Sequence, residues 1–232
     1  MRLLLALVLL VAPTFAAAEP IVVGGRVIQI PVPEGYAVVT RDMKAVWDLA
    51  EVAGGATNEV KLTLIAEEGV REALTGEMTG MVRYFMVQSM KALERQELSA
   101  SDFQEVMSLT RARISQSLME QVLDEAPEYF DKMSEIEARR TGTNPGIGIS
   151  GVKMMPLHRQ TDRSMAFSML MGTSFLDEFG TKHNAVIPAT NTIALINGRL
   201  LFFYAYGDAD DLDWTREVSD EWIHEILDAN PD

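Results

Sequence analysis

Two apolar runs separated only by the dipeptide Asn197-Gly198 constrain the fold of this chain more than any other stretch. Both residues of a type I′ turn need a positive φ, and Asn-Gly adopts it most readily. The stretch 191–206 is therefore predicted to form a β-hairpin with Ile196 opposite Arg199. Its two faces are both apolar, one with Ile193, Leu195, Leu200, Phe202 and Tyr204, the other with Ala194, Leu201, Phe203 and Ala205. Such a hairpin belongs inside a sheet that is covered on both sides.

The first 18 residues have the pattern of a secretory signal peptide. Arg2 provides a positive start, an apolar core covers residues 3–15, and Ala16-Ala17-Ala18 matches an A-x-A cleavage site. We expect cleavage after Ala18, a mature single domain that spans residues 19–232, and a periplasmic or secreted location, with a bacterial periplasm as the compartment. No other apolar stretch reaches spanning length, so no transmembrane segment is expected in the mature chain.

The composition is acidic and lacks cysteine. Thirty-four acidic residues outnumber 20 basic ones, which gives a formal net charge of −14. Such a field repels phosphate backbones and anionic lipid surfaces, so no nucleic-acid partner is expected. In an oxidising compartment a chain without cysteine depends on packing for its stability. The absence of cysteine also excludes thiol catalysis, thiolate metal sites and thiol redox chemistry.

Short elements are predicted in the first hundred residues. Two strands at 26–32 and 36–40 are joined by a Pro/Gly turn. A helix with Asp42 as its N-cap follows and ends at Gly54-Gly55. Strands are also predicted at 59–66 and 81–93. In the first of these we expect Val60, Leu62, Leu64 and Ala66 to face inward and Lys61, Thr63 and Glu67 to face outward.

The second half opens with a helical block at about 101–140. Ser101 and Gln104 match a capping box, and Pro127 predicts two helices or one helix kinked at proline. Strands at 152–160 and 164–175 follow, and a final helix carries Trp214, Val218, Trp222 and Ile226 on one ridge. The predicted fold class is α+β: a mostly antiparallel sheet with helices on both faces, an α/β/α sandwich, with the helical block as an insertion-like part.

The run Asp208, Asp210, Asp211 and Asp213 is the densest acidic cluster and the one candidate metal site. Its oxygen ligands would suit calcium, but its spacing does not match an EF-hand, because Leu212 and Asp213 stand where a ligand and a glycine are needed. Aspartates before a helix are also typical of caps and of residues that complement the helix dipole. We expect the structural role, and we assign no metal and no cofactor.

Other motifs do not identify a reaction. Gly146, Gly148 and Gly151 match G-x-G-x-x-G, but the motif follows a predicted helix and precedes a predicted strand, the reverse of the dinucleotide-binding context. Methionines at 154, 155, 165, 169 and 171 could bind copper(I), although core filling is their ordinary role. The three histidines lie in no metalloprotease motif, and a spatially assembled triad remains open. No catalytic residue is assigned.

The order of these elements resembles the PsbP-like family of extrinsic and periplasmic proteins. Three stretches show the resemblance: the opening strand, Pro-x-Gly-aromatic turn and strand at 27–36, the late hairpin that ends at 200–204, and the final tryptophan-bearing helix. The resemblance implies an antiparallel sheet between helical layers. It also implies a binding or accessory module of a larger complex, and it transfers no site residue to this chain.

Together these observations favour a non-catalytic periplasmic binding or accessory protein whose partner is an envelope protein or a small ligand. The alternative is a hydrolase or metal-dependent enzyme with a spatially assembled site. An enzyme should bring titratable groups together in a concave pocket, whereas a binding module should expose an apolar surface.

Overall fold

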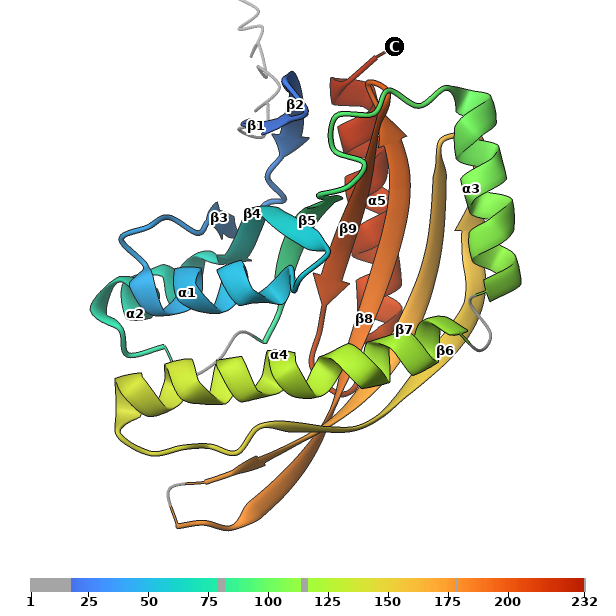
Figure 1. Cartoon of the computed structure of the whole chain (residues 1–232). Coiled ribbons are helices and arrows are strands. Elements are labelled where there is room, and N and C mark those ends of the chain that lie inside the picture. Colours follow the sequence, from blue (N-terminus) through green and yellow to red (C-terminus); the bar gives the residue numbers. More distant parts are fainter. Residues whose placement is uncertain (1–17, 79–81, 114–116, 178, 232) are drawn as a thin grey trace, which may run out of the picture.

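The computed structural model describes residues 18–78, 82–113, 117–177 and 179–231 (Figure 1). In these residues the strands are β1 Ala18–Val23, β2 Arg26–Pro31, β3 Tyr36–Val38, β4 Asn58–Ala66, β5 Tyr84–Met90, β6 Gly148–Gln160, β7 Ser164–Leu176, β8 Lys182–Ile196 and β9 Arg199–Tyr206. The helices are α1 Lys44–Ala53, α2 Val70–Thr75, α3 Ala100–Arg113, α4 Ser117–Thr141 and α5 Leu212–Ala229, with a 3-10 turn at Glu67–Gly69. The predicted signal peptide lies outside the described residues, apart from Ala18.

Seven strands form one antiparallel sheet in the order β3-β4-β5-β9-β8-β7-β6, and β1 and β2 form a separate hairpin. The predicted central hairpin is confirmed, because Ile196 pairs with Arg199 and Leu195 with Leu200. Asn197 and Gly198 have φ angles of 49° and 72°, as a type I′ turn requires. The α+β fold class is therefore confirmed.

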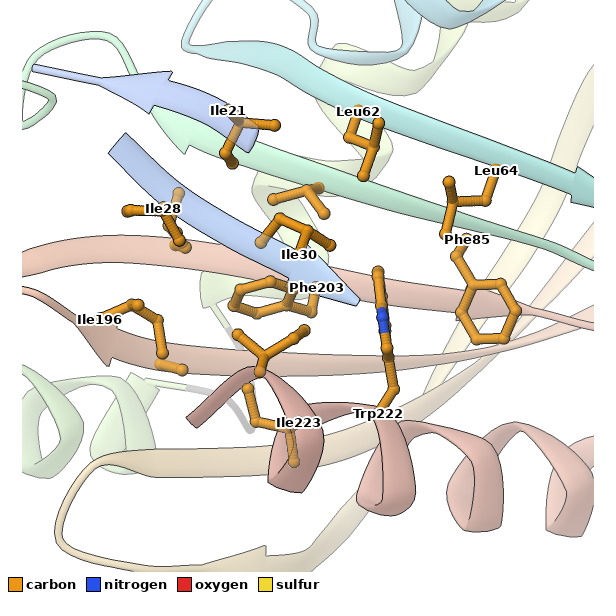
Figure 2. Close-up of a cluster of buried hydrophobic side chains, with 14 of the residues drawn as sticks. Ile21, Ile28, Ile30, Leu62, Leu64, Phe85, Ile196, Phe203, Trp222 and Ile223 are labelled. Atoms are coloured by element: carbon orange, nitrogen blue, oxygen red, sulfur yellow. The ribbon is translucent and has the colours of Figure 1, made fainter. Parts of the chain in front are cut away.

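Both faces of the sheet are covered. On one face Phe203 and Leu64 pack with α5 and with the β1–β2 hairpin, and Trp222 lies edge-on to Phe203 at a ring distance of 5.6 Å (Figure 2). On the other face α3 contributes Phe103 and Met107 to a second cluster that includes Met165 and Phe167. A third cluster joins α1 and α2 to Ile65. The predicted ridge of the last helix is confirmed, with Trp214, Val218, Trp222 and Ile226 all packed in the first cluster.

The helical block differs from the prediction in its break and in its cap. Two helices are present, but α3 ends at Arg113 and α4 begins at Ser117, and Pro127 lies inside α4. Of the two predicted alternatives, a helix boundary at Pro127 is thus wrong, and a kink of one helix at the proline stays a prediction. The capping box is formed two residues earlier than expected: the Ser99 hydroxyl accepts the Asp102 N–H at 3.2 Å, and the Asp102 carboxylate accepts the Ser99 N–H at 2.8 Å.

The N-terminal strands also pair differently. The predicted strands at 26–32 and 36–40 correspond to β2 and β3, but β2 pairs with β1, whereas β3 pairs with β4. The turn between β1 and β2 is Gly24-Gly25, with φ angles of 54° and 81°. The N-cap of α1 is Met43 without a side-chain cap, in place of Asp42. No helix in the described part of the chain is long and apolar enough to cross a membrane.

Candidate functional site

The acidic residues around the start of α5, Asp208, Asp210, Asp211 and Asp213, include two that form ion pairs with arginines. Arg83 donates to both carboxylate oxygens of Asp211 at 2.7 and 2.8 Å, and Asp211 also accepts the Asp208 N–H at 2.9 Å. Asp213 is 98% exposed, and its carboxylate lies 3.6 Å from Arg216. The expected cap at Asp213 is wrong: Asp211 is the N-cap residue, and it makes no side-chain cap bond. In the described ranges no three His, Cys, Asp or Glu side chains are placed to hold a metal ion.

The histidines do not form a hydrolytic site with the serines that the structure describes. His183 pairs with Asp177 at 2.8 Å, and His224 lies 3.6 Å from Asp228. Burial, opposed by the charge of Asp220, lowers the pKa of His158 below its usual value. Among the described residues no hydrogen bond joins a serine hydroxyl to an imidazole, so no serine–histidine nucleophile–base pair is formed there.

The His183–Asp177 pair instead shapes the tip of the β7–β8 hairpin. Asp177 accepts the backbone N–H groups of Phe179 and Thr181 at 2.9 and 2.8 Å. Hydrogen bonds from His183 and from the Thr181 N–H lower the pKa of Asp177. Phe179 is 84% exposed, so this tip presents an aromatic side chain to solvent.

The glycine and methionine motifs also have structural places. Gly148 begins strand β6, so the G-x-G-x-x-G stretch opens no helix and lacks the geometry that binds a pyrophosphate. Met165 is fully buried in the second cluster, and Met154 and Met169 pair across β6 and β7 and pack against it. These three methionines fill the core.

The feature that stands apart from these contacts is an incompletely paired strand edge. β3 pairs with β4 only at Leu64, Ile65 and Ala66, and one further bond joins the Val39 N–H to the Thr63 carbonyl at 2.9 Å. Beyond this point the chain leaves the sheet toward α1. The outer edge of β4 at 58–62 therefore has no neighbouring strand in the described part of the sheet. Its first part is covered, because the Asn58 N–H donates to the Gly54 carbonyl at 3.0 Å and the Gly54 backbone lies against the Asn58 carbonyl. The open stretch of the edge is therefore 60–62.

A hollow of about 460 Å³ lies along this edge, between the β1–β2 hairpin and α1. We call it the β4 groove. Its wall on the hairpin side comes from residues 19–22, its wall on the helix side from Trp47, Ala50 and Glu51, and residues 59–63 of β4 run along it. The remaining lining residues are Val38, Val39 and Thr40. Figure 2 shows Ile21 of β1 and Leu62 of β4 among the buried side chains of the first core cluster.

Lys61 anchors the hairpin wall to β4. Its ammonium lies 2.8 Å from Glu59 and 3.0 Å from Glu94, and only 9% of its side chain is exposed. Burial works against the charged lysine, but the hydrogen bonds to both glutamates outweigh burial and raise the pKa of Lys61. Glu94 also accepts the Gly24 N–H at 3.2 Å in the turn of the hairpin. This contact chain fixes the position of the hairpin relative to the edge.

A register shift between Val60 and Leu62 explains why Lys61 differs from its predicted orientation. An extra residue in a strand breaks the alternation of its side chains. Lys61 therefore reaches Glu94 on the hairpin side, where Leu62 is also buried. Thr63, expected to face outward, is only 4% exposed because the helical layer covers that face as well. Its hydroxyl oxygen makes no hydrogen bond to any of the described residues.

The lining combines apolar walls with an acidic rim. Glu19, Glu51 and Glu59 contribute three carboxylates, and Lys61 contributes the one cation, so the lining has an excess of two negative charges. Sequence analysis did not find this site, because its walls come from segments that are distant in the chain. Gly24-Gly25 between two apolar runs is the signal that could have predicted the β1–β2 wall.

Comparisons with protein-family models and with curated proteins found no match to this chain. The resemblance to the PsbP-like family therefore stays a prediction from the sequence.

Proposed function

We propose that this chain is a non-catalytic binding or accessory protein of the bacterial periplasm that uses the β4 groove to bind another envelope protein. The observation that carries the proposal is the coincidence of the hollow with the open edge of β4 at 60–62. Unpaired backbone groups at a sheet edge are ready to pair with a second chain. The signal-peptide pattern and the resemblance to the PsbP-like family support the compartment and the accessory role.

The chemistry of the groove favours binding over catalysis. Lys61 is bound to Glu59 at 2.8 Å and to Glu94 at 3.0 Å. The two other carboxylates of the lining, Glu19 and Glu51, come from different walls of the groove. Neither histidine pair described above contributes to the lining. A general acid or base needs a free titratable group that points at a substrate. The groove instead offers apolar surface and backbone, which suit recognition of another chain.

Site-specific photo-crosslinking tests this function. A photoreactive residue replaces Val22, which is 59% exposed and lines the groove, and in a matched control it replaces Leu109, which is 53% exposed on α3. We expect one periplasmic protein to crosslink from position 22 and not from position 109, and to bind the purified chain directly in solution. Equal labelling from both positions, or no direct binding of the captured protein, would refute the proposal.

The compartment has its own test. N-terminal sequencing of the protein from a periplasmic fraction should begin at Glu19, the residue after the predicted cleavage site. Protein that begins at Met1 and stays in the cytoplasm would refute the location.

A further inference from the structure

The geometry points to a specific class of occupant for the β4 groove. We propose that it binds an extended segment of the partner, apolar and with at least one lysine or arginine, as a short added strand along β4 at 60–62. This inference rests on the proposed function, because it names the part of the partner that the groove would recognise. Addition of a strand to a sheet edge is an established mode of peptide recognition.

The edge has the length and the cover that a strand needs. Residues 60–62 span roughly 10 Å at the rise of an extended chain, and β3 pairs with β4 over the same number of residues. An added strand would continue the line of β3, which leaves the sheet after Val38. It would lie between two layers, with the hairpin wall near Ile21 on one side and the α1 wall near Ala50 on the other. Alternate side chains of the segment would then be buried on opposite sides, as in the rest of this sheet.

Two features of β4 could instead protect its edge from unwanted pairing, because bulges and lysines commonly do so. The lysine does not act in this way here. Lys61 is held by Glu59 and Glu94 on the hairpin side, and 9% of its side chain is exposed. Its charge is therefore compensated by two carboxylates, although Lys61 lines the groove. The register shift between Val60 and Leu62 lies between β4 and β5, on the opposite edge of β4.

The charge of the rim selects the occupant. Glu51 and Glu19 have no lysine or arginine partner in the described chain, and Glu59 shares its one partner with Glu94. A basic side chain on the segment would compensate this acidic rim. A second copy of the chain would do the opposite, since pairing two β4 edges would bring the same carboxylates together. Acidic peptides and anionic small molecules are disfavoured for the same reason.

A displayed library of random peptides of roughly 10 residues, long enough for one strand, is the probe. Selection on the purified mature chain should enrich peptides that alternate apolar residues and contain lysine or arginine. The best peptide is then resynthesised with single N-methyl groups along its backbone. Because only every second N–H of a strand points at its neighbour, affinity should fall at alternate positions. Hydrogen exchange should also slow in β4 at 60–62 when the peptide binds.

A charge reversal tests the rim. Glu51→Lys changes an exposed residue of α1 that lines the groove, and Glu217→Lys makes the same change on α5, outside the groove. Glu51→Lys should weaken the selected peptide about fivefold, the scale of a reversed rim charge, and raised salt should reduce the difference. Glu217→Lys should leave the affinity unchanged. Circular dichroism checks that both variants fold.

The outcomes separate this inference from the proposed function. Selected peptides without basic residues, a loss of affinity with helical spacing on N-methylation, or equal effects of the two charge reversals would overturn the added strand. If position 22 still crosslinks to a periplasmic partner in that case, the binding function stands and only the class of occupant is wrong. A concentration-dependent dimer that protects residues 60–62 would also overturn it and would assign the edge to a second copy.

Discussion

Arg83 and Asp211 join two elements that are 128 residues apart in the chain. Arg83 directly precedes β5. Its guanidinium donates to both carboxylate oxygens of Asp211 at 2.7 and 2.8 Å and lies 4.6 Å from the centre of the Trp214 ring. The pair therefore fixes the start of α5 against the start of β5. A bidentate arginine–carboxylate pair has a more defined geometry than a single charge contact.

Asp211→Asn should lower the free energy of unfolding by about 0.5–1 kcal/mol, because Arg83 is half exposed and water screens the pair. The hydrogen bonds from Arg83 lower the pKa of Asp211, so its contribution is fully present above the unfolded pKa of about 3.9 and is lost as the pH falls through the lower folded pKa. Urea unfolding should show a wild-type advantage at pH 7 that shrinks below about pH 4. Asp213→Asn, at a 98% exposed side chain, is the control and should change stability very little. A larger loss for Asp213→Asn would contradict this assignment.

Calcium should leave the melting temperature of the wild type nearly unchanged. Asp211 is bound to Arg83, and Asp213 points into solvent, so the run Asp208–Asp213 does not present converging oxygen ligands. A specific ion at a hundredfold excess over its dissociation constant would add about 2.7 kcal/mol. Thermal melts with EDTA and with millimolar calcium check this expectation. A calcium-dependent rise of that size, abolished by Asp208→Asn, would establish a metal site.

Phe203→Ala should destabilise the chain by about 3–5 kcal/mol, as expected for a fully buried aromatic ring. Phe203 is 2% exposed and packs edge-on against Trp222. Phe202→Ala should cost less, about 1–2 kcal/mol, since Phe202 is only partly buried on the α3 face of the sheet. Urea unfolding of both variants measures the order. Equal losses would mean that the two faces of the central hairpin are covered alike.

The features predicted correctly from the sequence are those that depend on neighbouring residues. Asn197-Gly198 determines its turn through the φ angles that these two residues tolerate, and the turn then sets the register of β8 and β9. The ridge of α5 follows in the same way from the spacing of Trp222 and Ile226. The register predicts which face of the hairpin each side chain lies on, but not how deeply each face is buried. The structure buries Phe203 fully and Phe202 only partly.

The features that the sequence did not reveal depend on distant segments. β2 pairs with β1, and nothing near Val38 marks where β3 leaves the sheet, because residues 36–40 are predicted as strand throughout. Helix α4 runs through Pro127, although a proline inside a helix pattern ordinarily predicts a boundary or a kink. The β4 groove is formed where three segments distant in the chain meet: the β1–β2 hairpin, strand β4 and helix α1. Local patterns contain no information on that coincidence.

Glu94→Gln should destabilise the chain by about 1–2 kcal/mol, because it weakens hydrogen bonds to a charged and largely buried lysine. Glu94 accepts from Lys61 at 3.0 Å and from the Gly24 N–H at 3.2 Å, so it joins β4 to the β1–β2 turn. The variant should therefore also speed hydrogen exchange in β1 and β2 more than in β8 and β9. Glu97→Gln is the control: it breaks an exposed pair with Arg26 on the same hairpin and should cost less than about 0.5 kcal/mol.

The pH dependence of this loss follows from both partners. Although burial opposes it, the hydrogen bonds from Lys61 and the Gly24 N–H lower the pKa of Glu94, so its contribution is present above the unfolded pKa of about 4.3 and is lost as the pH falls through the folded pKa. The pKa of Lys61 is raised, so its contribution is present below about 10.4 and is lost as the pH rises through the folded pKa. The difference between wild type and Glu94→Gln should thus be flat from about pH 5 to 10 and should shrink on both sides. A difference that peaks within that range would show that another group controls the hairpin wall of the groove.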